Sequence, residues 1–232
     1  MRRDIVVVRS SVKVAAAVLA AGLAAAACGS VQMGAAAISG DQRISSAALA
    51  AQVANLTTAY EADQGKVQIS YTKAQMPRLV LSWLLRFRIR DEMARQEGLH
   101  VTAEDGQQAL RSLAAQIKQQ SASATLAQVA VANAIPPDLM TDLGRYQAVQ
   151  NELIDRFDGG KLPGSTSGQQ ALQARFNHAQ CLASKNLGIS VNPQYGRLDY
   201  AQLTVVAATS GLSSAAGVSP APSPPAGSRP AC

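Results

Sequence analysis

Cysteine and histidine are the side chains of this sequence best suited to nucleophilic or metal chemistry, and both are scarce. Among the 232 residues there are three cysteines, Cys28, Cys181 and Cys232, and two histidines, His100 and His178. Neither histidine has a second histidine or a cysteine four residues away, which argues against a metal site. No group of His, Lys or Asp residues that would activate Cys181 is evident. The sequence also has no glycine-rich phosphate loop or nucleophile elbow, so it predicts no catalytic residue, no metal and no cofactor.

Cys28 is the residue for which the sequence predicts a covalent modification. A basic segment, residues 1–13, precedes a short apolar run, residues 14–24, and small residues then lead directly to the cysteine. A helix needs about 20 apolar residues to span a bilayer, so this shorter run is typical of a cleavable export signal. The junction resembles a bacterial lipobox, although Ala25 stands where that pattern prefers leucine.

Two interpretations of Cys28 follow. In the first, its sulfur forms a thioether with a diacylglycerol that carries fatty acids such as palmitate, and Cys28 becomes the new N-terminus. Two acyl chains, each worth about 0.8 kcal/mol per buried methylene, would then anchor the protein at the extracytoplasmic face of the cell membrane. In the second, the protein is secreted in soluble form and Cys28 is incidental.

Both ends of the chain are expected to lie outside the folded domain. We predict a signal peptide over residues 1–27, a tether over 28–33, one domain over 34–203 and a disordered tail over 204–232. The tail is rich in Ala, Ser and Pro, and five of the ten prolines of the chain lie in it. A segment of this composition cannot bury enough apolar area to offset the entropy lost on ordering.

The charge of the chain argues against a nucleic acid partner. The formal net charge is +6 at pH 7, but the predicted signal carries Arg2, Arg3, Arg9 and Lys13 against Asp4, which accounts for +3 of it. The remaining basic residues are not interleaved with aromatic residues at the density typical of nucleic-acid-binding proteins.

Composition and hydrophobic spacing predict a mainly α domain. An alanine-rich chain in which aromatic residues make up only 4% favours helices over a β-sandwich. Apolar residues at helical spacing predict helices over about residues 45–60, 77–97, 102–119, 121–133, 139–157 and 169–187. Apolar stretches on either side of Gly40-Asp41 predict a hairpin, and residues 189–191 predict a strand. The expected fold is a multi-helix domain with a small β element formed by the N-terminal hairpin and a C-terminal strand.

Three segments, taken in order, resemble a known family. The hairpin carries AISGDQRIS, the long helix ends in RQEGLHVTAED, and the closing helix leads into ISVNPQYGRLD. Together these resemble the N-terminal chaperone domain of SurA- and PrsA-type foldases, in the lipoprotein form common in high-GC Gram-positive bacteria. The resemblance covers about residues 34–200. It implies a SurA N-terminal-like helical module that binds unfolded or nascent secreted polypeptides near the membrane without ATP.

The resemblance does not carry an enzymatic activity with it. In those families a parvulin prolyl-isomerase domain often lies between the helical region and the closing helix. The matching segment here, residues 158–168, has eleven residues, which is too short for such a domain. We therefore expect a protein that is not an enzyme. Two alternatives stay open, a non-catalytic envelope lipoprotein that scaffolds one specific partner and a cryptic peptidyl-prolyl isomerase.

Trp83 and Phe87, on the helix expected over residues 77–97, are the candidate residues for contact with a client polypeptide. Exposed aromatic surface would suit extended apolar segments. The alternative is that both rings fill the core of the domain. On the same helix, Arg86, Arg88 and Arg90 could steer acidic clients or anionic headgroups, or could form a solvated face with local Asp and Glu partners.

Overall fold

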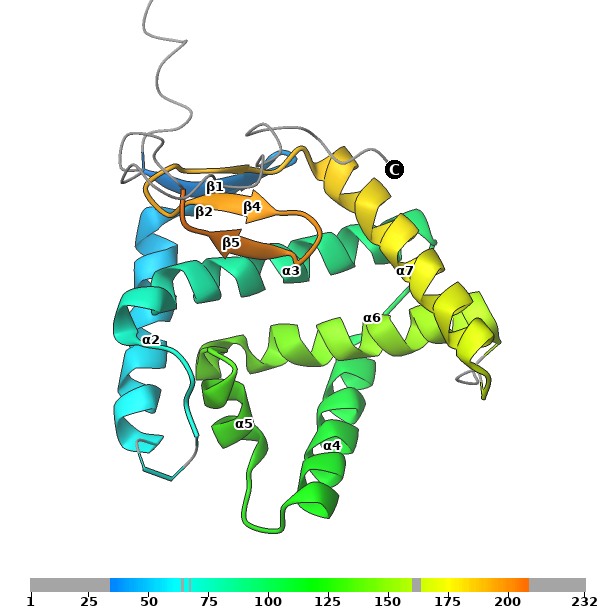
Figure 1. The fold of residues 1–232 in the computed structure, drawn as a ribbon, viewed down its shortest axis with the longest axis horizontal. Coiled ribbons are helices and arrows are strands. Elements are labelled where there is room, and N and C mark those ends of the chain that lie inside the picture. The colour runs from blue at the N-terminus through cyan, green and yellow to red at the C-terminus, as the bar shows by residue number, and fades with distance from the viewer. Residues whose placement is uncertain (1–33, 64, 67, 160–163, 209–232) are drawn as a thin grey trace, which may run out of the picture.

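The computed structural model describes residues 34–63, 65–66, 68–159 and 164–208. The predicted signal peptide, Cys28 and Cys232 lie outside these residues. Within them the chain forms six α-helices and five short strands, which confirms a mainly α fold with a small β element (Figure 1). The helices are α2 (Ser46–Asp63), α3 (Met76–Gln96), α4 (Ala103–Gln120), α5 (Leu126–Ala132), α6 (Met140–Asp158) and α7 (Thr166–Leu187). The strands are β1 (Ala35–Ser39), β2 (Gln42–Ser45), β3 (Ser190–Val191), β4 (Arg197–Asp199) and β5 (Thr204–Val206).

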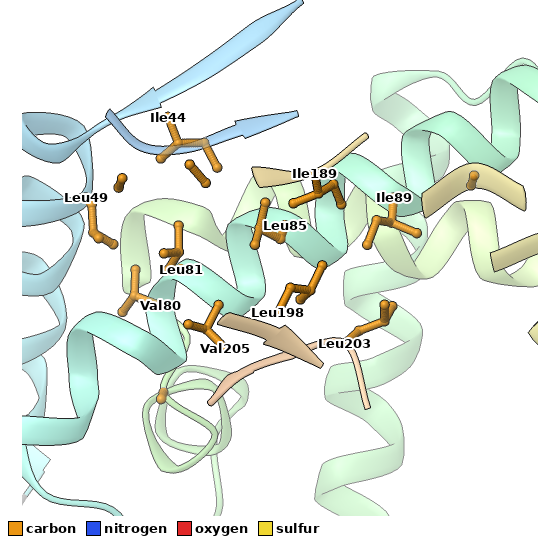
Figure 2. Packing of buried hydrophobic residues seen from close by; sticks show 14 of the residues in the cluster. Ile44, Leu49, Val80, Leu81, Leu85, Ile89, Ile189, Leu198, Leu203 and Val205 are labelled. Carbon is orange, nitrogen blue, oxygen red and sulfur yellow. The ribbon is translucent and has the colours of Figure 1, made fainter. Parts of the chain in front are cut away.

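Helix α3 is the centre of the fold, since it contacts α2, α6, α7 and β5. Leu81, Leu85, Ile89 and Met93 recur every four residues along it, so they form one apolar stripe, and all four are buried. Figure 2 shows Leu81, Leu85 and Ile89 of this stripe among apolar side chains from distant parts of the chain, namely Ile44, Leu49, Ile189, Leu198, Leu203 and Val205. One continuous core therefore joins the first strands, the central helix and the last strands.

The first sheet has three antiparallel strands in the order β2-β1-β3. The predicted hairpin turn is present, with Gly40 at a φ of +62°, a conformation that glycine adopts without a steric penalty. Strand β3 pairs with the other edge of β1, where Ala37 lies opposite Val191. The small β element therefore consists of the N-terminal hairpin and a C-terminal strand, as predicted.

The second sheet, formed by β4 and β5, was not predicted, and it corrects the domain boundary. The sequence predicts a disordered tail from residue 204, but residues 204–206 form β5, which pairs antiparallel with β4. Three consecutive β-branched residues favour an extended strand. Helix α3 holds this strand, because the Val205 N–H donates to Ser82 Oγ at 2.7 Å and Arg86 Nε donates to the Leu203 carbonyl at 3.0 Å.

Helices α4 and α5 extend away from the two sheets in Figure 1, and α4 packs against α6. A capping box begins α4, since Thr102 Oγ1 accepts from the Asp105 N–H at 3.2 Å and the Asp105 carboxylate accepts from the Thr102 N–H at 2.8 Å. The Thr102 hydrogen bonds lower the pKa of Asp105. In the part of the chain that the structure describes, no helix combines the length and apolarity needed to cross a membrane.

Candidate functional site

A surface groove lies beside the hairpin turn, where β1 and β2 approach α3. It encloses about 470 Å³, and we call it the hairpin groove. The hairpin contributes Ser39, Asp41 and Gln42, α3 contributes Leu84, Phe87, Arg88, Asp91, Glu92 and Arg95, and the wall is completed by Asp142 of α6 and Leu187 of α7. This volume falls within the range of pockets that bind ligands, about 300–1,000 Å³.

The periodicity of α3 places its groove residues on one side of the helix. Leu84, Phe87, Arg88, Asp91 and Arg95 follow one another at intervals of three, one, three and four residues, which is the spacing of a single helix face. The hairpin turn is fixed against the end of α7, because the Gly40 N–H donates to the Leu187 carbonyl. Four segments, the hairpin, α3, α6 and α7, therefore meet at the groove.

The groove combines apolar side chains with charges of both signs. Leu84, Phe87 and Leu187 supply the apolar part, and Phe87 is buried while the two leucines are half-buried. The charged part includes Asp91, whose carboxylate accepts a 2.7 Å hydrogen bond from Arg145 Nε in an ion pair. Such a surface can hold an apolar side chain while polar groups on either side of it stay in contact with water or charge.

Glu92 is the best-anchored carboxylate of the groove. Arg95 makes a bidentate contact with the Glu92 carboxylate, in which Nε donates to Oε2 at 2.7 Å and Nη2 donates to Oε1 at 2.6 Å. Gln96 Nε2 also donates to Oε1 of Glu92, at 2.9 Å. The hydrogen bonds from Arg95 are the main reason that the pKa of Glu92 is lowered. Glu92 therefore stays ionised and engaged, which suits a structural role in the wall and not that of a proton acceptor.

Asp142 is the carboxylate of the groove that is least favourably placed for its charge. Partial burial raises its pKa, and the negative charge of Asp91 raises it further, while Arg88 and Arg145 act in the opposite direction. The groove thus contains two kinds of carboxylate: Glu92 stays ionised, whereas the charge of Asp142 depends on its neighbours.

Trp83 and Phe87 are placed together, but only Phe87 lines the groove. Their rings lie 5.8 Å apart, and both contact the ring of Tyr146, at 6.1 Å from Trp83 and 5.8 Å from Phe87. The Trp83 indole N–H donates to the Asn133 carbonyl at 2.8 Å, which fixes the ring against the start of the α5–α6 connection. Phe87 therefore lines the groove, and Trp83 packs against the Phe87 ring without lining the groove itself.

The three arginines of α3 do not form one solvated face with local acidic partners. Arg86 donates to the carbonyls of Gln202 and Leu203 and stacks over Trp83, with its Cζ 4.8 Å from the ring centroid. Arg88 lines the groove near Asp142, and Arg90 is buried. Two residues turn a helix by about 200°, so Arg88 lies on the opposite side of α3 from Arg86 and Arg90. Arg86 and Arg90 share a side, and they differ because Arg86 donates to the Gln202 and Leu203 carbonyls while Arg90 packs against Tyr146.

Several groove residues were not singled out from the sequence. Leu84 could have been found, because it lies three residues before Phe87 on the same helix face. Asp142 and Leu187 could not, since only the tertiary packing of α6 and α7 brings them to α3.

The described residues contain no group of three or more His, Cys, Asp or Glu side chains placed to hold a metal ion. Cys181 of α7 is disulfide-bonded and half-buried. The other two cysteines, including the predicted acylation site Cys28, lie outside the described residues.

No family model, no curated protein and no solved structure matches this chain. Its function is therefore inferred from its sequence and from the groove.

Proposed function

We propose that the protein is a membrane-anchored, extracytoplasmic chaperone that holds unfolded exported polypeptides without using ATP, and that the hairpin groove binds the client. The observation that carries this proposal is the groove itself, which presents Leu84, Phe87 and Leu187 between charged side chains of both signs. The order of sequence segments that resembles SurA- and PrsA-type domains supports the same function.

The chemistry of the groove suits a weak and unselective client interaction. An apolar side chain gains about 25 cal/mol for each Å² that it removes from water, whatever its exact shape. A groove of about 470 Å³ has room for only a few side chains, so each contact is readily reversed. Charges of both signs at its edge, such as Arg88 and Asp91, can accommodate flanking residues of either charge.

An aggregation-suppression assay tests the proposal. The purified protein, added in excess to a chemically denatured model client, is expected to reduce light scattering in the absence of ATP. Replacing Leu84→Asn removes apolar contact area from the groove and should weaken the effect about tenfold, which corresponds to a loss of about 1.4 kcal/mol. Leu182→Asn is the matched control, because Leu182 is an exposed leucine of α7 outside the groove.

Crosslinking separates this function from the scaffolding alternative. A photo-reactive amino acid placed at position 88 at the edge of the groove should capture many unfolded exported proteins. Capture of one folded protein at a fixed stoichiometry would favour a scaffold instead. Failure of the wild-type protein to suppress aggregation at stoichiometric excess would argue against the chaperone proposal.

A further inference from the structure

A second pocket, between α6 and α7, shares no residue with the hairpin groove. It encloses about 470 Å³ and is lined by apolar side chains and glutamine amides around one arginine, Arg90 of α3. Ile154, Leu172 and Phe176 are the apolar residues. Among the residues that the structure describes, no Asp or Glu lines this pocket. We call it the Arg90 pocket.

Arg90 is a buried cation whose donors are only partly used. The residue is 8% exposed. Its Nη2 donates to the Tyr146 hydroxyl at 2.9 Å, and its Cζ lies 4.4 Å from the centroid of that ring and 5.8 Å from the centroid of Phe176. Its Nη1 is buried and has no hydrogen-bond partner within the described residues.

No carboxylate of the described residues balances this charge. Arg90 takes part in none of their ion pairs. The two acidic residues that follow it on α3 are already engaged, Asp91 by Arg145 and Glu92 by Arg95. The partners that Arg90 does have are aromatic rings and a hydroxyl group, which solvate a cation without neutralising it.

A guanidinium group keeps its proton throughout the physiological pH range, so burial cannot neutralise it. Leaving a buried charge without a counterion is costly, and a planar carboxylate is the anion that matches the forked N–H donors of arginine. The apolar walls of the Arg90 pocket suit a hydrocarbon group beside that carboxylate, and amides such as those of Gln150 and Gln173 can hydrogen bond to a peptide group.

We infer that the Arg90 pocket binds a ligand that ends in a carboxylate and carries an apolar group next to it. Two sources have this chemistry, the C-terminus of a polypeptide with an apolar last residue and a free aliphatic acid. This inference goes beyond the proposed chaperone function, because it concerns a different pocket and a defined end group.

Calorimetric titration of the full protein with three probes tests the inference. The probes are N-acetyl-Ala-Leu with a free carboxylate, the same dipeptide as its C-terminal amide, and hexanoate. The free acid is expected to bind at least about tenfold more tightly than the amide, because the amide cannot form a charge-assisted bidentate contact. Tighter binding of the dipeptide acid than of hexanoate identifies a polypeptide C-terminus as the source, and the reverse order identifies a free acid. Equal binding of acid and amide, or no binding of any probe at millimolar concentration, would overturn the inference.

Substitutions locate the binding at Arg90. Arg90→Gln should reduce affinity for the acid about tenfold and leave affinity for the amide unchanged. Because Arg90 also packs against Tyr146, a second variant avoids the core. Gln173→Glu places a negative charge on an exposed lining residue and should weaken acid binding severalfold through repulsion.

Gln170→Glu is the matched control for Gln173→Glu. Gln170 is exposed on the same helix but does not line the pocket, so the net charge of the protein changes equally. Equal effects of the two glutamates would place the carboxylate elsewhere and overturn the assignment. A selective effect of Gln173→Glu supports it, whether or not the hairpin groove binds clients.

Discussion

Gly144 of α6 lies against Gly106 of α4, and the two glycines let the helix backbones meet. A Cβ atom placed on Gly144 would be 2.6 Å from the Gly106 carbonyl oxygen and 2.9 Å from Leu110 Cγ. A Cβ atom on Gly106 would be 3.2 Å from the Arg145 backbone nitrogen. The contact between α4 and α6 therefore has no room for a methyl group at position 144.

Gly144→Ala should destabilise the protein, since the new methyl group would force α4 and α6 apart. We expect a loss of about 1–3 kcal/mol in the free energy of unfolding, measured by urea denaturation. Gly164→Ala is the control, because a Cβ atom at Gly164 meets no atom within 4 Å. Equal stability of the two variants would contradict the tight contact.

Tyr71 should make the stability of the protein depend on alkaline pH. Burial, and to a smaller extent Tyr60, raises the pKa of Tyr71 to about 12 from the ordinary value of 10.0. Since the unfolded chain loses this proton more easily, the stabilising contribution is complete below pH 10 and is lost as the pH rises to about 12. This difference in the pKa of Tyr71 between the folded and unfolded protein corresponds to about 2–3 kcal/mol in the free energy of unfolding.

Tyr71→Phe isolates that contribution. At pH 8 the variant should be less stable by about 1 kcal/mol, because the hydroxyl no longer donates to the Val131 carbonyl. The difference from wild type should shrink and then reverse as the pH rises above 10, as followed by urea denaturation. A difference that stays constant across this range would show that Tyr71 ionises as an ordinary tyrosine.

Asp142 should titrate at a higher pH than an ordinary aspartate, as followed by ¹³C NMR of its carboxyl carbon. Asp91→Asn should lower its pKa, because a neighbouring negative charge is removed, and Arg88→Gln should raise it, because a neighbouring positive charge is removed. Because the folded-state pKa is raised, ionisation of Asp142 opposes folding, and stability from this residue falls as the pH rises through its titration. Shifts of the same sign in both variants would refute this assignment of causes.

Cys28→Ser should release the protein from membranes if Cys28 carries the lipid. Cells supplied with labelled palmitate are expected to label the wild-type protein in the membrane fraction and to leave the variant unlabelled. Cys181→Ser removes a cysteine together with its disulfide but leaves position 28 unchanged, so it should keep the label. Unchanged labelling of Cys28→Ser would contradict acylation at this residue, and a wild-type protein that takes up no label and is recovered from the medium would favour the soluble secreted form.

The regular elements could be predicted where local chemistry decides them. The predicted starts of α3 and α4 agree with the structure to within one residue, and the predicted hairpin turn is at Gly40. Pro77, the capping box at Thr102 and the glycine at position 40 mark these element ends. Helix α7 begins at Thr166, three residues earlier than predicted, because the Ser165 hydroxyl caps it by accepting from the Gly168 N–H at 3.2 Å.

The second sheet and the two pockets could not be predicted in the same way. Strand β5 is short, and it is held by a hydrogen bond to Ser82, a residue 123 positions earlier in the chain. Arg90 ends the same alternating run as Arg86 and Arg88, and only the packing of Tyr146 and Phe176 around it shows that it is buried. Such pairings between distant residues leave no periodic signal.

The position of β1 between β2 and β3 also governs when the domain can finish folding. The side-chain amide of Asn192 donates to the Ala35 carbonyl at 3.0 Å, across 157 positions of sequence. Leu198, Leu203 and Val205 complete the core around the apolar stripe of α3, so part of that stripe stays uncovered until they arrive. Closing contacts of such long range is slow, because the entropy of a large loop is lost first. Almost the whole domain would therefore have to leave a ribosome or a translocation channel before folding is complete. A chain that ends before β3 would lack the last strand of the first sheet.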